Sequence, residues 1–294
     1  MSSNSGAVDV RLLDAPTSDG GRVELAIHPV DVTEPPRVGI VYIHGKGGNF
    51  YGLPFRPLVP HLAAAGTVHV SVNMRCHDLG YTRTDVPSAD SVKVADVAVG
   101  GGFWEDLDIG VHDLEAAVRH ARELGCQDVF LVGHSAGGFY AAAYAAADPA
   151  IAGLVLLSPL TSNKTNLGMW FPQPGELETA LARAKQMVEQ GRGHHLIPIN
   201  AWFYGVSATT LLQRAAELDG VWSANLNAAR RPTLVLWGAQ ESRGPMFRRL
   251  VEELQYDDKR WIELAEGEHN YIGQEEITAS YIRRFVDERS RRAS

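Results

Sequence analysis

The sequence predicts an α/β fold: a mostly parallel central sheet with helices on both faces and an inserted helical cap. Short apolar runs alternate with helical stretches over most of the chain, an order of elements typical of a parallel sheet. Several of these runs are apolar without interruption, as expected of strands buried on both faces. The alternation breaks between residues 159 and 231. We therefore expect a core of residues 1–158 and 232–294 and a helical cap of residues 159–231.

The first part of the chain contains the predicted start of the sheet. Two β-rich segments flank an Asp-Gly-Gly sequence at residues 19–21, which is typical of a hairpin turn. Prolines at positions 54, 57 and 60 restrict the first helix to the later part of its segment. The expected elements are strands at residues 8–13, 22–27, 38–43 and 67–74 and a partly helical segment at residues 51–65.

The remainder of the chain continues the alternation after a long irregular segment at residues 75–103. This segment exceeds the length of an ordinary connection, so we expect it to have a functional role or to be mobile. The expected helices are residues 106–124, 139–147, 177–189, 209–218 and 274–289. The expected strands are residues 129–132, 151–158, 233–237 and 259–264.

The composition is that of a globular protein, and it restricts the partners that we expect. The 294 residues are 45% hydrophobic and 21% charged, which allows a sizeable core. A net charge of −8 argues against nucleic acid, and no apolar run approaches the length of a membrane span. The polar first residues lack a signal peptide's features, and two cysteines, Cys76 and Cys126, cannot form a disulfide framework. We expect a cytoplasmic protein, with the oligomeric state left open.

The most informative motif is the Gly-His-Ser-Ala-Gly-Gly sequence at residues 133–138. It follows a predicted strand and precedes an alanine-rich predicted helix, which is the context that the G-x-S-x-G motif requires. Glycines at both ends allow a turn too sharp for flanking side chains. The central residue, Ser135, is expected to adopt a strained backbone conformation at the positive end of the helix. These features make Ser135 a candidate nucleophile.

A serine nucleophile needs a base and an acid, and both are predicted at the same edge of the sheet. His269 follows the last predicted strand, so it lies at the carboxyl edge where Ser135 also lies. Glu241 is the only carboxylate in the Gly-Ala-Gln-Glu-Ser loop after the strand at residues 233–237. The chain order of nucleophile, acid and base then matches that of a Ser-His-acid triad. Asp219, in the predicted cap, is the weaker alternative acid.

Backbone amides are the expected donors to an oxyanion. Ala136, directly after the nucleophile, supplies the first. The second is expected in the His-Gly-Lys-Gly-Gly-Asn loop at residues 44–49, where Lys46 is the first choice and Gly47 the next. This loop lacks the spacing of a phosphate-binding loop. We expect His44 to be structural and to hold the loop.

Together, these motifs resemble those of the α/β-hydrolase superfamily. The resemblance rests on the His-Gly-Lys-Gly-Gly loop, the serine motif, Glu241 and His269, with further support from residues 73–78 after the fourth strand. It covers nearly the whole chain in order, and it implies a cap inserted between the sixth and seventh strands. Many relatives have an aspartate at the position of the acid, whereas this chain offers Glu241. The superfamily is functionally broad, so the resemblance does not select a substrate.

These predictions favour a serine hydrolase that cleaves an ester or lactone of a mainly apolar small molecule through an acyl-enzyme. Amide, thioester or C–C bond hydrolysis and acyl transfer on the same triad are alternatives, as is a non-catalytic binding module. The sequence contains neither an H-E-x-x-H nor a C-x-x-C motif, and the rings of the adjacent His194 and His195 would point apart in a helix or strand. We therefore expect no metal or cofactor. The expected substrate-binding residues are Gly47, Trp104, His134, Met169, Trp170, Phe171, Trp202, Phe203 and Tyr204.

Overall fold

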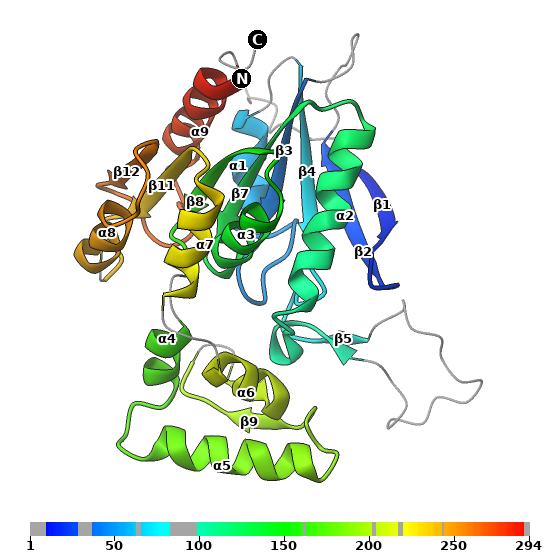
Figure 1. Ribbon diagram of the computed structural model, residues 1–294, viewed down its shortest axis with the longest axis vertical. Helices are drawn as coiled ribbons and strands as arrows, with labels where there is room; N and C mark the ends of the chain where they lie inside the picture. Colours follow the sequence, from blue (N-terminus) through cyan, green and yellow to red (C-terminus); the bar gives the residue numbers. More distant parts are fainter. Residues whose placement is uncertain are drawn as a thin grey trace, which may run out of the picture.

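The computed structural model contains the predicted sheet and its flanking helices (Figure 1). The structure describes residues 10–28, 37–62, 66–82, 99–160, 163–201, 204–216, 220–242 and 244–290. The eight strands of the main sheet are β1 (Arg11–Pro16), β2 (Arg22–His28), β3 (Val38–Ile43), β4 (Thr67–Asn73), β7 (Asp128–His134), β8 (Ile151–Leu157), β11 (Thr233–Gly238) and β12 (Lys259–Leu264).

The sheet has the order β1-β2-β4-β3-β7-β8-β11-β12. Strand β2 pairs antiparallel with β1 and with β4, whereas the strands from β4 to β12 pair in parallel. The central strands are buried on both faces, which explains their uninterrupted apolar sequences. The predicted α/β fold with a mostly parallel sheet is confirmed.

Helices cover both faces of the sheet. One face packs against α2 (Ile109–Glu123), α3 (Ala136–Ala147), α7 (Val221–Ala229) and α8 (Gly244–Glu252). The other face packs against α1 (Phe55–Leu62) and α9 (Glu275–Ser290). The sequence analysis did not predict α7 and α8. Helix α8 begins with Gly-Pro, and a proline fits a first helical turn because the amides there have no partner within the helix.

A separate group of elements lies between β8 and β11. It consists of α4 (Asn163–Trp170), α5 (Glu176–Glu189), β9 (Leu196–Pro198), β10 (Gly205–Ser207) and α6 (Ala208–Ala216). We call it the α4–α6 group. It has its own hydrophobic cluster and lies below the sheet in Figure 1, with α5 farthest from it. The group includes the two expected helices, α5 and α6, and also α4 and an antiparallel strand pair, which the sequence analysis did not predict. Helix α7 lies within the predicted cap of residues 159–231, but its Trp222 packs in the main core. The predicted boundary of the cap at residue 231 stays a proposal.

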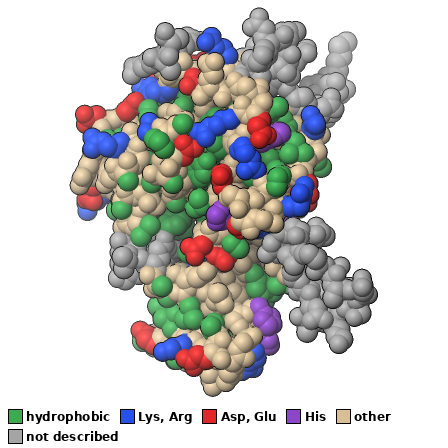
Figure 2. Space-filling model, turned by 45° about the vertical axis from the view of Figure 1, so that its right-hand side comes forward, with side chains coloured by type: hydrophobic (Ala, Val, Ile, Leu, Met, Phe, Trp, Pro, Cys, Tyr) green, Lys and Arg blue, Asp and Glu red, His purple; other side chains and the backbone are tan. Residues whose placement is uncertain are grey.

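Several shorter features complete the described structure. Within the long segment predicted as irregular, β5 (Tyr81–Thr82) pairs with β6 (Val99–Gly100), and a short 3-10 helix, η2 (Gly102–Trp104), follows. In the described part of the chain, no helix is both long and apolar enough to cross a membrane. On the face shown in Figure 2, basic and acidic side chains are interspersed.

Candidate active site

Ser135 occupies a strained turn between β7 and α3. Its φ of 53° and ψ of −119° lie in a region that side chains other than glycine rarely adopt. The flanking glycines are required by close backbone contacts. A Cβ atom on Gly137 would lie 2.1 Å from the carbonyl oxygen of Ile43, and one on Gly133 would lie 2.5 Å from the carbonyl oxygen of Gly137. The predicted glycine-flanked turn is therefore present, with Ser135 at the beginning of α3.

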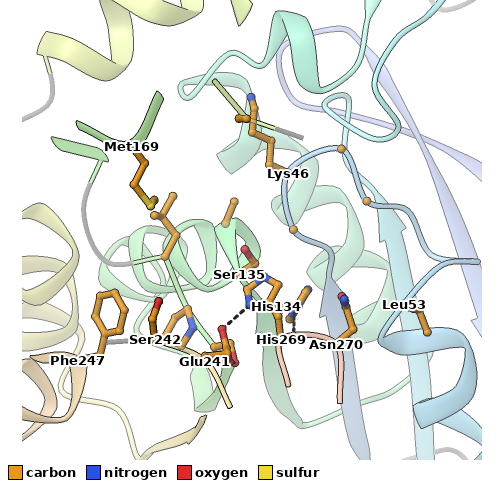
Figure 3. Close-up of a pocket in the computed structure, with 18 of the residues that line it drawn as sticks. Lys46, Leu53, His134, Ser135, Met169, Glu241, Ser242, Phe247, His269 and Asn270 are labelled. Atoms are coloured by element: carbon orange, nitrogen blue, oxygen red, sulfur yellow. Dashed lines mark hydrogen bonds and ion pairs between the residues drawn. The ribbon is translucent and has the colours of Figure 1, made fainter. Parts of the chain in front are cut away.

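His269 and Glu241 meet beside this turn (Figure 3). Glu241 follows β11 and His269 follows β12, so both lie at the carboxyl ends of parallel strands. The Nδ1 atom of His269 lies 2.6 Å from the Oε2 atom of Glu241. Because a carboxylate accepts, Nδ1 carries the hydrogen, and Nε2 is left as the basic nitrogen of the neutral ring. The alternative acid, Asp219, lies outside the described residues.

The second oxygen of Glu241 has its own support, which the sequence analysis did not identify. The hydroxyl of Ser158 donates to Oε1 of Glu241. The hydroxyl of Tyr271 lies 2.7 Å from Oγ of Ser158 and 2.8 Å from the carbonyl oxygen of Leu236. Ser158 and Tyr271 both have positive φ values, 42° and 60°. Ser158 directly follows β8, so the rule that sites form at the carboxyl ends of parallel strands could have identified it from the sequence.

His134 connects the serine turn to the loop that carries His269. Its Nε2 atom donates to the carbonyl oxygen of His269 at 2.8 Å, and the two rings are 4.8 Å apart. Burial, together with the neighbouring His269, lowers the pKa of His134 to about 3, so the ring is neutral at pH 7. The sequence analysis expected His134 to bind substrate. It does border the cavity described below, but its Nε2 atom is engaged with the protein backbone.

The loop after β3 approaches Ser135 from the other side. Gly48 donates its amide to the carbonyl oxygen of Gly45 at 2.9 Å, which closes a tight turn with Lys46 and Gly47 at its centre. A Cβ on Gly45 would lie 2.9 Å from Cβ of Ser135, so the loop passes directly beside the serine. Gly47 has a φ of 65°, which favours glycine. In Figure 3 the Lys46 side chain extends away from Ser135.

His44 holds this loop, as the sequence analysis expected. Its Nδ1 atom donates to the carbonyl oxygen of Gly45 at 2.8 Å, and its Nε2 atom accepts from the amide of Met74 at 3.0 Å. Burial lowers the pKa of His44 to about 4, which keeps the ring neutral at pH 7. The neutral ring can therefore donate at one nitrogen and accept at the other.

A cavity of about 870 Å³ opens above Ser135. Among the predicted substrate-binding residues, it is bordered by Gly47, His134, Met169 and Trp170. Three other residues of that set do not border it. Trp104 donates its ring N–H to the carbonyl oxygen of His194, Phe171 packs in the α4–α6 group, and Tyr204 is 79% exposed. Trp202 and Phe203 lie outside the described residues.

Polar residues missed by the sequence analysis also border the cavity. Arg214 reaches it from α6, and Asn200 and Asn270 contribute amide groups. Behind Arg214 and Lys46 lies the buried carboxylate of Glu105. Burial alone would raise the pKa of Glu105, but the positive charges of Arg214 and Lys46 outweigh it and hold this pKa well below its usual range. Within the described ranges, no group of three or more histidine, cysteine or acidic residues could hold a metal ion.

Comparison with known proteins identifies the family. Residues 40–279 match the model of an "Alpha/beta hydrolase family", and the chain belongs to this family. Searching curated protein sequences gave no match.

Solved structures with the same fold include two esterases. Est1E from Butyrivibrio proteoclasticus is 16% identical, with a TM-score of 0.64, covering 95% of this chain and 98% of Est1E. An esterase from Pyrococcus furiosus is 15% identical, with a TM-score of 0.59, covering 96% of this chain and 92% of the esterase. A hypothetical protein from Pseudomonas aeruginosa has a TM-score of 0.72 at 14% identity, covering 97% of this chain and 95% of that protein. At these identities the likeness shows the fold.

Proposed function

We propose that this protein is a serine hydrolase that cleaves an ester or lactone of a mainly apolar small molecule. The observation that carries the proposal is the 2.6 Å contact between Glu241 and His269 beside a serine at a positive φ. A neutral histidine whose Nδ1–H is held by a carboxylate presents Nε2 as a general base. The esterases among the similar structures support an ester as the substrate class.

In the proposed reaction, the hydroxyl oxygen of Ser135 attacks the substrate carbonyl while His269 accepts the hydroxyl proton of Ser135. His269 then protonates the leaving group, and the acyl group remains on the Ser135 oxygen. His269 next removes a proton from water, which attacks the acyl-enzyme and releases the acid. Glu241 orients His269 and stabilises its positive charge. The main-chain amides of Ala136 and Lys46 stabilise the oxyanion in both acylation and deacylation.

Hydrolysis of p-nitrophenyl esters of increasing acyl length tests this proposal. We expect turnover of neutral esters, a preference set by the cavity, and no turnover by Ser135→Ala. A Ser135→Ala variant with full activity would show that the mechanism is wrong. A strict preference for charged acyl groups would refute the mainly apolar substrate class.

Other reactions and a non-catalytic role are outcomes that related assays distinguish. Amide, thioester or C–C bond hydrolysis and acyl transfer use the same residues, so substrates of each type belong in the assay. A purely ligand-binding protein would bind small molecules without turnover and would not react with a fluorophosphonate at Ser135. The net charge of −8 argues against nucleic acid as a partner, and on the face shown in Figure 2 basic side chains are interspersed with acidic ones. A cytoplasmic location, without a membrane partner, remains part of the proposal.

A further inference from the structure

Glu105 contacts three parts of the molecule that meet at the candidate active site. Its Oε2 atom accepts hydrogen bonds from Nζ of Lys46, at 2.7 Å, and from Nη2 of Arg214. Its Oε1 atom accepts from the hydroxyl of Tyr140 at 2.7 Å. Its carbonyl oxygen accepts from the hydroxyl of Thr210 at 2.7 Å. One residue therefore joins the loop after β3, the helix that begins beside Ser135, and helix α6.

These contacts are shielded from water. Glu105 is 1% exposed, and the side chains of Lys46 and Arg214 are 11% and 2% exposed. A buried charge is stable only while its partners stay in place, because removal of one partner leaves an uncompensated charge in a medium of low polarity. Lys46 and Arg214 therefore hold fixed positions relative to each other through Glu105.

The anchored side chain of Lys46 also restrains the backbone turn to which it belongs. Besides Glu105, Nζ of Lys46 donates to the carbonyl oxygen of Gly102 at 2.5 Å. The backbone of Gly102 packs closely on this turn, since a Cβ on Gly102 would lie 3.1 Å from both Cα and N of Gly47. The position of the Lys46 amide is thus tied to the segment from Gly102 to Glu105.

Helix α4 takes part in the same arrangement through Trp170. The Nζ atom of Lys46 lies 5.9 Å from the ring centre of Trp170, and Cζ of Arg214 lies 5.5 Å from it, distances typical of cation–π contacts. Trp170 also borders the cavity. The α4–α6 group therefore touches the Lys46 side chain directly and through Glu105.

We propose that Glu105 is a positioning residue that couples the α4–α6 group to the loop after β3, residues 44–49. The Lys46 amide has its working orientation only while Arg214 is docked on Glu105. This inference rests on the proposed function, in which that amide stabilises the oxyanion. The hydrogen bond from the Lys46 amide to the oxyanion should therefore weaken when the contact between Arg214 and Glu105 is removed. This should hold even for a substrate too small to need the α4–α6 group for binding.

A double-mutant cycle between Lys46→Met and Arg214→Met tests the coupling. The substrate is p-nitrophenyl butyrate, and active sites are counted by the endpoint of fluorophosphonate titration, so unfolded protein does not lower the apparent rate. We expect each single variant to lose about 10- to 100-fold in kcat with little change in KM, because an ångström of misplacement can cost about 100-fold. The double variant should lose no more than the worse single variant. Effects that multiply, or an Arg214→Met variant with normal kcat, would overturn the proposal.

Two further variants separate positioning from general destabilisation. Lys46→Arg keeps a cation that can pair with Glu105, and it should recover most of the kcat lost in Lys46→Met. Arg289→Met is the matched control, because Arg289 is also a buried arginine paired with a carboxylate, that of Asp258, but on α9. It should keep the normal kcat for each titrated site. An equal loss of kcat in Arg289→Met, or no recovery in Lys46→Arg, would contradict the role assigned to Glu105.

Hydrogen exchange gives a readout that does not depend on catalysis. In Arg214→Met, amide exchange should increase in residues 44–49 as well as in α6. Faster exchange confined to α6 would overturn the coupling. If the wild-type protein neither hydrolyses esters nor reacts at Ser135, the proposed function fails, and the exchange experiment still decides whether the two segments are coupled.

Discussion

Replacement of Glu241 by glutamine tests the acid of the proposed triad. The substitution keeps the length and shape of the side chain and removes its negative charge. In the structure, Oε2 of Glu241 lies 2.6 Å from Nδ1 of His269. Glutamine would offer either an uncharged oxygen or an N–H group to this atom, and the N–H group would favour the wrong tautomer of His269.

The size of the expected loss follows from the geometry of the pair. A 2.6 Å contact places the centres of the two charges about 4 Å apart, where unit charges interact by about 4 kcal/mol at an effective dielectric constant of about 20. That value suits a pair near the surface, since the side chains of His269 and Glu241 are 44% and 14% exposed. Because about 1.4 kcal/mol corresponds to a factor of ten, kcat should fall about 10³-fold.

The assay is steady-state hydrolysis of p-nitrophenyl butyrate at pH 7.5, with active sites counted by fluorophosphonate titration. KM should change little, because the lost interaction strengthens only when His269 becomes charged. Glu266→Gln is the control, since Glu266 is an exposed carboxylate in the same loop as His269. A Glu241→Gln variant within tenfold of wild type, together with a large loss in Asp219→Asn, would refute the assignment and favour Asp219.

Three further predictions concern the support of the site. Ser158→Ala should lower kcat about tenfold by removing a hydrogen bond to the charged Glu241; an unchanged kcat would contradict this. Gly137→Ala should prevent folding to a soluble protein, because its Cβ would overlap a backbone oxygen; a normal melting temperature would refute the contact. Burial lowers the pKa values of His44 and His134 in the folded protein. Below about pH 6.5 these two side chains therefore take up protons in the unfolded chain but not yet in the folded one, and the free energy of unfolding decreases. Each of the two histidines should reduce the free energy of unfolding by about 2 kcal/mol at pH 5 relative to pH 7.5. Equal free energies of unfolding in urea at pH 7.5 and pH 5 would contradict this.

The sequence predicted the features that depend on local chemistry. Uninterrupted apolar runs identified the parallel strands, and the glycines around Ser135 identified the turn before its backbone contacts were known. Chain order and the position after each strand were enough to select Glu241 and His269. Their direct contact in the structure agrees with that choice, while their catalytic roles remain a proposal.

The sequence did not predict features that depend on contacts between distant segments. Glu105 belongs to no motif, and only the folded chain brings Lys46 and Arg214 to it. The sequence could have predicted that Arg214 is buried, since it lies three residues after Leu211 on the same face of α6. The aromatic residues of the predicted cap were harder to assign. Composition alone cannot distinguish Trp170, which borders the cavity, from Tyr204, which is exposed to solvent.

Intact-protein and peptide mass spectrometry after reaction with a fluorophosphonate tests the central claim most directly. The account predicts one phosphonyl adduct for each chain, located on Ser135, with loss of ester hydrolysis in proportion to labelling. Ser135→Ala should remain unlabelled and inactive while its melting temperature stays close to that of wild type. Labelling at another residue, or hydrolysis that continues after Ser135 is fully modified, would contradict the account.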